Sequence, residues 1–401
     1  MTKGEVPGRT SLGFKQPREK PVTPQVPKGT ELVWEGIVIE EEAYGEDGTV
    51  PAELISTMKN ELAYRMVTSK GAISTAGLRQ LAELEGLRTL QIFAPDVSET
   101  LDLSTLDFSV LSRHNRLREL KISSIDRLTN ETLFQLSTLK CIKHLRLGIG
   151  ASTIDFSGVD DTGIKELSKL KSLRWFHIPH HGKPMSISDA GLAPLGTLPR
   201  LQVLHLWSES IDGSGLAALS TCPELHTLHL NSCSVTAAGL KSLVKLKSLS
   251  VLDVSGTDID ASFAETASQL NQLRHLELSH STIADEFFEK WTAPPTLLSL
   301  SLDKTAVTDR TIAALVKNPP PNLTTLSLKG DALTDRAISL LANDPPPSLK
   351  TLDISYIETI SKDAATELQK IKTLEMIMVP KSFDKAAKLS LKAAIPGVSI
   401  Y

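Results

Sequence analysis

Leucine and other apolar residues recur along most of the chain in a six-residue pattern whose first, fourth and sixth positions are apolar. The pattern occurs twelve times, beginning at Leu87, Leu117, Ile142, Leu173, Leu201, Leu225, Leu249, Leu273, Leu297, Leu323, Leu349 and Leu374. Consecutive starts lie 24 to 31 residues apart. A self-similar period of this length predicts a solenoid of stacked units, each of which contacts only its neighbours.

The unit that begins at Leu225 shows which elements the pattern predicts. Its first six residues alternate between apolar and polar, which is typical of a strand that buries one side. Its second half places Leu240, Leu243 and Leu246 at helical spacing, with Thr236 as a candidate N-cap. Each unit is therefore expected to be one strand and one helix, and the whole chain an α/β solenoid.

The two ends of the chain differ from the repeats. Residues 1–30 are rich in proline, glycine and basic residues, which predicts a disordered basic tail. We expect residues 31–72 to form an N-terminal cap of one strand and one helix, because apolar residues recur at helical spacing from Leu54 to Val67. The repeats then occupy residues 73–380. Residues 381–401 are expected to form a C-terminal cap, with a short helix over 385–394 and a final extended piece.

The repeated unit resembles the cysteine-containing type of leucine-rich repeat, which occurs in F-box adaptors and in bacterial repeat proteins. Residues 201–216 and 225–240 match this type best, and Cys222 and Cys233 stand where it places its cysteines. The resemblance implies a curved, ribonuclease-inhibitor-like solenoid of about twelve repeats, with parallel strands on the concave face and helices on the convex face. It also implies a protein-binding role. The segment after Val50 is too short to be a convincing F-box.

Composition and charge narrow the classes of partner. The formal net charge of −4 argues against a general nucleic-acid binder. Three cysteines form no disulfide framework, and neither an apolar leader nor a membrane-spanning run is visible. We therefore expect a cytoplasmic, monomeric protein with a protein or peptide partner, no nucleic acid, no membrane and no cofactor.

Between the last two leucines of each motif stands a residue that should point out of the concave face. From the first motif to the last, this concave column reads Gln91, Lys121, Arg146, His177, His205, His229, Asp253, Glu277, Ser301, Ser327, Asp353 and Met378. Basic residues come first, then histidines, then acids. Trp175 and Trp207 lie next to the histidines, and aromatic residues are favoured anchors at binding surfaces. The third and fourth repeats also carry extra residues after their strands, and such insertions often build a binding surface. The predicted partner-binding residues are Arg146, Trp175, His177, His205, Trp207, His229, Asp253 and Glu277.

Other interpretations of the column stay open. It can be an ordinary solvated polar face, or His177, His205 and His229 can bind zinc, although residues on a flat sheet give poor tetrahedral geometry. The chain has no phosphate-binding loop, no H-E-x-x-H and no G-x-S-x-G motif, so no catalytic or metal-binding residue is assigned. We expect a non-enzymatic binding scaffold. The alternative is a substrate adaptor or enzyme regulator whose residues 31–70 contact an effector.

Overall fold

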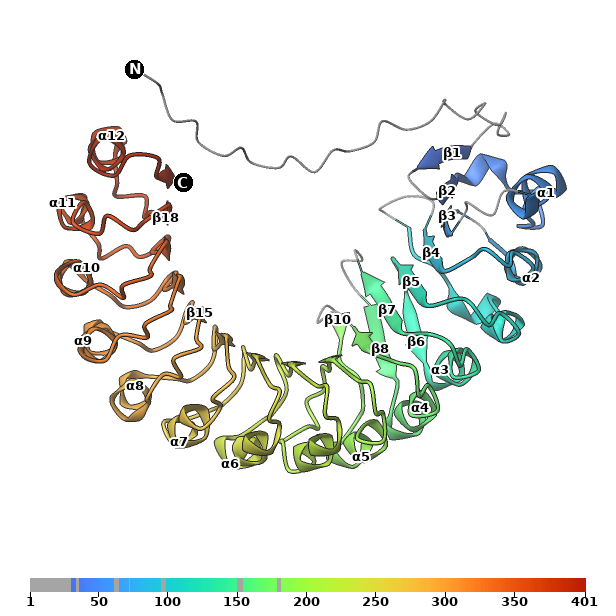
Figure 1. Cartoon of the computed structure of the whole chain (residues 1–401), viewed down its shortest axis with the longest axis horizontal. Coiled ribbons are helices and arrows are strands. Elements are labelled where there is room, and N and C mark those ends of the chain that lie inside the picture. The colour runs from blue at the N-terminus through green and yellow to red at the C-terminus, as the bar shows by residue number, and fades with distance from the viewer. Residues whose placement is uncertain are drawn as a thin grey trace, which may run out of the picture.

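The protein forms an open horseshoe in which the strands line the inner side and the helices lie on the outer side (Figure 1). The computed structural model describes residues 30–33, 36–60, 65–71, 73–94, 99–149, 154–178 and 182–401. The predicted disordered tail falls almost wholly outside these residues. The predicted α/β solenoid, with parallel strands on the concave face, is confirmed.

The concave face of the described chain is one sheet of sixteen strands that follow one another in chain order. Neighbouring strands pair in parallel throughout, except for the antiparallel pair β1–β2 at the N-terminal end. The strands are β1 (Thr30–Val33), β2 (Gly36–Ile39), β3 (Met66–Lys70), β4 (Thr89–Phe93), β5 (Glu119–Ser123), β7 (His144–Ile149), β9 (Trp175–His177), β11 (Val203–His205), β12 (Thr227–His229), β13 (Val251–Asp253), β14 (His275–Glu277), β15 (Ser299–Ser301), β16 (Thr325–Ser327), β17 (Thr351–Asp353), β18 (Met376–Met378) and β19 (Ser399–Ile400).

Helices connect the strands along the convex side. The α-helices are α1 (Ala52–Asn60), α2 (Thr75–Ala82), α3 (Asn130–Leu136), α4 (Asp161–Leu167), α5 (Leu192–Leu195), α6 (Ala237–Leu240), α7 (Phe263–Ser268), α8 (Asp285–Lys290), α9 (Asp309–Lys317), α10 (Asp335–Asn343), α11 (Ala364–Leu368) and α12 (Lys385–Ala394). Short 3-10 helices are η1 (Glu41–Ala43), η2 (Leu103–Thr105), η3 (Phe108–Leu111), η4 (Asp189–Gly191), η5 (Leu216–Thr221) and η6 (Lys241–Lys245). In the described part of the chain, no helix is long and apolar enough to cross a membrane.

The apolar positions of the repeated pattern form one continuous core between the sheet and the helices. Leu225, Leu228 and Leu230 are all buried, and equivalent residues of the neighbouring repeats pack against them. The Thr236 hydroxyl caps α6 by accepting a hydrogen bond from the amide of Gly239, as the sequence predicts. Neither half of a repeat can bury its apolar side alone, so the stacking of repeats stabilises both.

The N-terminal segment differs from its predicted structure. The strand expected before residue 40 is a hairpin of β1 and β2, and the helix expected to reach Val67 ends at Asn60. Met66 and Val67 belong instead to β3, which pairs in parallel with β4. Their helical spacing was misleading because Val67 is buried as an inward residue of the sheet. The repeat-like stacking therefore starts before residue 73, and the limits of both terminal caps stay a prediction.

Residues of the second, third and fourth repeats form a second, three-stranded sheet that the sequence did not predict. Its strands are β6 (Arg127–Thr129), β8 (Ile154–Gly158) and β10 (Gly182–Lys183), which lie beside the N-terminal part of the main sheet (Figure 1). Asp155 in the central strand accepts hydrogen bonds from Ser157 and lies 3.1 Å from the Lys183 ammonium. These contacts lower the pKa of Asp155 to about 2.

The two cysteines that the family resemblance places in the repeat are structural. Cys222 and Cys233 are buried, and their thiols donate to the carbonyl oxygens of Leu195 and Leu206 in the preceding repeat. Burial raises the pKa of Cys222 to about 11 and that of Cys233 to about 12. Both thiols therefore stay protonated at neutral pH, which makes them poor nucleophiles.

Candidate binding surface on the concave face

The concave column is a continuous row of side chains on neighbouring strands. Strand register places Gln91 beside Lys121, Lys121 beside Arg146, and Arg146 beside His177. Farther along, His205 pairs with His229, which pairs with Asp253, and Asp253 with Glu277. Since parallel strands lie about 4.8 Å apart, the column joins a basic, a histidine and an acidic section on one surface.

The basic section combines cations with aromatic rings. The Arg146 guanidinium lies over the Trp175 ring, 4.9 Å from its centroid, and the His144 ring lies 5.3 Å from the same indole. One repeat earlier, the Lys121 ammonium lies 5.0 Å from the centroid of the Phe93 ring. Cations attracted to aromatic faces in this way are held in place before any partner arrives.

The rings of the three histidines of the column contact one another in series, the first pair edge to face and the second pair stacked. The ring centroids of His177 and His205 are 4.2 Å apart, and those of His205 and His229 are 3.8 Å apart. The second pair is nearly parallel, with an angle of 23° between the ring planes. Among the described residues, no group of three His, Cys, Asp or Glu side chains is arranged to hold a metal ion.

The histidine section is joined to the acidic section by a hydrogen bond. Nδ1 of His229 lies 3.1 Å from Oδ2 of Asp253, while Oδ1 of Asp253 accepts from the amide and hydroxyl of Ser255. Burial alone would raise the pKa of Asp253, but the hydrogen bonds from His229 and Ser255 outweigh it and lower that pKa. Asp253 therefore carries a negative charge and fixes the orientation of the last imidazole.

The acidic section continues as a network of hydroxyls and carboxylates. Glu277 accepts a hydrogen bond from the Ser279 hydroxyl, which lies 2.8 Å from the Ser301 hydroxyl. Burial is the main reason that the pKa of Glu277 is raised, and the nearby Asp253 carboxylate adds to it. One repeat on, Asp303 accepts from the hydroxyl of Ser327 at 2.5 Å. A network that fixes its own side chains in this way is rigid.

The residues that extend this network lie two positions after the concave column, and the sequence analysis did not assign them. Ser255, Ser279 and Asp303 stand at this position in successive repeats. Reading a second column along the repeats would have found them. The predicted anchor Trp207 stands in that second column as well, and it is half-buried and packs against the core.

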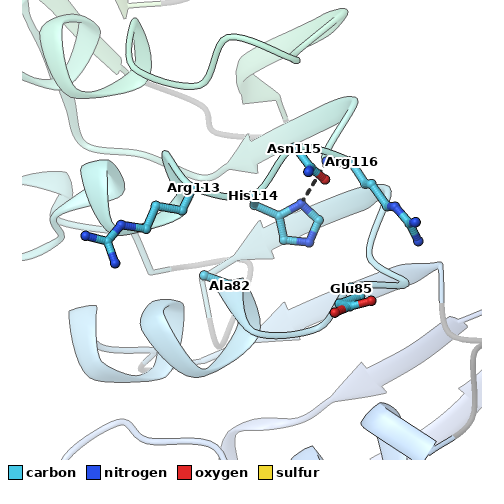
Figure 2. A pocket seen from close by; sticks show the side chains of 6 residues that line it. All are labelled: Ala82, Glu85, Arg113, His114, Asn115 and Arg116. Atoms are coloured by element: carbon cyan, nitrogen blue, oxygen red, sulfur yellow. Dashed lines mark hydrogen bonds between the residues drawn. The ribbon is translucent and has the colours of Figure 1, made fainter.

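A shallow hollow of about 290 Å³ lies on the edge of the solenoid, between the loops that precede β4 and β5. Figure 2 shows Arg113 and Arg116 on either side of it, pointing away from each other. Nδ1 of the buried His114 accepts from the amide of Leu117, so its Nε2 donates to the carbonyl of Leu84. His114 therefore ties two repeats together.

Comparison with known proteins agrees with this architecture. A family model described as leucine rich repeat matches residues 223–283. No curated protein sequence matches significantly. The structure is similar to TLR13 in its complex with ssRNA13, at 19% identity and a TM-score of 0.50, over 81% of this chain and 46% of that one.

Two bacterial structures are also similar. A leucine-rich-repeat protein of Leptospira interrogans is 16% identical, with a TM-score of 0.48, over 90% of this chain and 94% of that one. An internalin of Listeria monocytogenes is 18% identical, with a TM-score of 0.45, over 75% and 94%. Likeness at such low identity concerns the fold. The twelve-fold motif, the parallel sheet that it builds and the matching family model together show that the chain is a leucine-rich-repeat protein.

Proposed function

We propose that the protein is a non-enzymatic scaffold that binds a protein or peptide along its concave face. The observation that carries this proposal is the in-register column from Arg146 to Glu277, whose side chains are held by stacking and hydrogen bonds. Stacked repeats provide extended concave surfaces of the kind that suits an elongated partner. Because these side chains are already ordered, binding costs less conformational entropy than it would on a flexible surface.

The order of charges along the column supports a single orientation of the partner. Arg146 lies toward one end of the histidine stack, and Asp253 and Glu277 lie toward the other. A partner with an acidic section opposite Arg146 and a basic section opposite Asp253 and Glu277 would meet opposite charges along the whole column. Electrostatic complementarity of this kind increases the association rate and selects the orientation more than it increases affinity.

Changing the centre of the surface tests the proposal. A variant with Trp175, His177, Trp207 and His229 all replaced by alanine is expected to bind a partner captured by the intact chain at least about 30-fold more weakly, since such anchors dominate interface energies. Calorimetry with the purified partner measures this, and circular dichroism checks that the variant is folded.

The matched control replaces four exposed residues of the convex side with alanine: Lys241, Glu265, Lys290 and Lys317. This control is expected to keep the affinity of the unchanged protein. Full affinity in the folded concave variant, or an equal loss in the convex control, would contradict the proposal.

The alternative function, an adaptor or regulator, needs a second partner that contacts residues 31–70. In that case the concave variant would lose its first partner and keep the second. The end of the sheet at the β1–β2 hairpin is where such an effector would bind.

A further inference from the structure

A basic residue stands directly before each of the first five parallel strands of the main sheet that follow the N-terminal hairpin. These residues, which we call the pre-strand row, are Arg65 before β3, Arg88 before β4, Arg118 before β5, Lys143 before β7 and Arg174 before β9. The eight strands from β11 to β18 have only two basic residues at this position, Arg274 and Lys350. The row is therefore a property of the N-terminal half of the solenoid.

A ladder of backbone hydrogen bonds holds the members of the row next to one another. The amide of Arg88 donates to the carbonyl of Arg65, that of Arg118 to Arg88, that of Lys143 to Arg118, and that of Arg174 to Lys143, each at 2.7 Å. At about 4.8 Å a step, the row is about 19 Å long. It lies beside the basic section of the concave column, where Arg146 projects from β7.

Within the part of the chain that the structure describes, no ion pair balances the positive charge of the row. Burial and the charges of Arg116, Arg118 and Arg65 lower the pKa of Arg88, which shows how close these cations lie. Among strands β3, β4, β5, β7 and β9, the only acidic residue described is Glu119.

Two members of the row are held in fixed orientations. Nη1 of Arg88 donates to the carbonyl oxygens of Glu85 and Gly86, and Nη1 of Arg118 donates to that of Asn115. These bonds occupy one nitrogen of each guanidinium. Nε of Arg174 is buried without a hydrogen-bond partner. Concentrated like charge and an unsatisfied buried donor both cost stability, and a negatively charged ligand would offset that cost.

We propose that the pre-strand row, together with Lys121 and Arg146, binds an acidic stretch of an extended peptide or protein segment. This inference rests on the proposed scaffold function and names the chemistry of the partner. A run of cations about 19 Å long fits a segment of roughly six extended residues, which rises about 3.3 Å per residue. Guanidinium groups bind carboxylates in pairs of parallel hydrogen bonds, which suits alternating Asp and Glu side chains.

The geometry favours an acidic peptide over a small anion or a nucleic acid. A small anion would need cations that converge on one point. The hollow beside the row does not provide this, because the two arginines that line it, Arg113 and Arg116, point away from each other (Figure 2). Single-stranded nucleic acids are bound by basic grooves with aromatic rings that stack on the bases. Here one face each of the Trp175 and Phe93 rings is occupied by the cations of Arg146 and Lys121.

The test uses the full chain and a fluorescein-labelled twelve-residue peptide of alternating Glu and Ser, with binding followed by fluorescence anisotropy. The row variant carries Arg65→Glu and Lys143→Glu, because neither side chain forms an ion pair with the residues that the structure describes. The control variant carries Arg274→Glu and Lys350→Glu, which stand at the same position of later repeats and change the net charge equally. Lys350→Glu also removes an exposed ion pair with Glu375, which contributes little to stability. Thermal melting by circular dichroism verifies that both variants are folded.

The row variant is expected to bind the acidic peptide about 10-fold more weakly than the unchanged protein, and the control variant less than about 2-fold more weakly. Binding should also weaken as salt is raised. Equal effects of the two variants would overturn the proposal. So would binding of a twelve-nucleotide oligo-dT, of phosphatidylserine vesicles or of a matching Lys–Ser peptide more tightly than the acidic peptide.

The failure of this proposal can be told apart from failure of the scaffold function. If the row variant keeps full affinity for the captured partner while the concave alanine variant loses it, the acidic-segment proposal is wrong and the scaffold function stands. If the concave variant keeps full affinity, the scaffold function is wrong whatever the row variant does.

Discussion

Replacing Leu252 with alanine is expected to lower the free energy of unfolding by about 3 kcal/mol, the usual cost of a cavity in a packed core. Leu252 lies at the centre of β13 and is fully buried between Leu228 and Leu276 of the neighbouring strands. The substitution leaves an apolar cavity that water does not fill, and the repeats on both sides prevent the core from collapsing into it. Urea unfolding followed by circular dichroism measures the change.

The matched control for this prediction is Leu389→Ala. Leu389 lies on α12 and is 57% exposed, so its loss is expected to change the free energy of unfolding by less than about 0.5 kcal/mol. A similar loss in both variants would mean that the repeated leucines are not what holds the solenoid together.

Replacing Asp331 with asparagine is expected to stabilise the protein at neutral and higher pH. Asp331 is 5% exposed, its Oδ1 accepts from the amide of Thr305, and its Oδ2 has no hydrogen-bond partner. Burial, with a contribution from the nearby Asp303 carboxylate, raises the pKa of Asp331 to about 8. Ionising such a group in the folded state is costly, and an uncharged amide of the same shape avoids that cost.

The pH dependence of this effect has a definite sign. Below the ordinary pKa of 3.8, Asp331 is protonated in both folded and unfolded chains and costs nothing. Between 3.8 and about 8 the unfolded chain releases its proton first, so the folded state loses stability as pH rises, and the loss is complete above about 8.

Urea unfolding at pH 5 and pH 9 compares the two proteins. The gain from Asp331→Asn should grow between these values and reach about 2 kcal/mol or more at pH 9. Other titrating groups affect both proteins alike, so the difference isolates Asp331. A gain that is the same at both pH values would contradict the assignment.

The sequence predicts the concave column because the strand alternation leaves no other arrangement. When Leu228 and Leu230 point into the core, His229 between them must point out, and parallel stacking then places it beside His205 and Asp253. The contacts within the column could not be predicted in the same way. Whether the His229 imidazole stacks on His205 or hydrogen-bonds to the Asp253 carboxylate depends on side-chain rotations, which the sequence pattern does not specify.

Elements without the leucine pattern were predicted less well. β3 has Ser69 at an inward position where the repeats have an aliphatic residue, and that serine is buried because the Tyr44 hydroxyl donates to it at 2.5 Å. The second sheet joins β6, β8 and β10 from three different repeats, and the last of these has two residues. Pairing between such short, separate segments leaves no periodic signal.

The central claim is that a partner lies against the concave face, and site-specific photo-crosslinking tests it most directly. A benzophenone amino acid at Thr227, which faces the same side of β12 as His229, is expected to crosslink the captured partner. The same group at Lys241, which is exposed at the start of η6 on the convex side, is expected to form no crosslink to the partner. Crosslinking from Lys241 and none from Thr227 would contradict the claim.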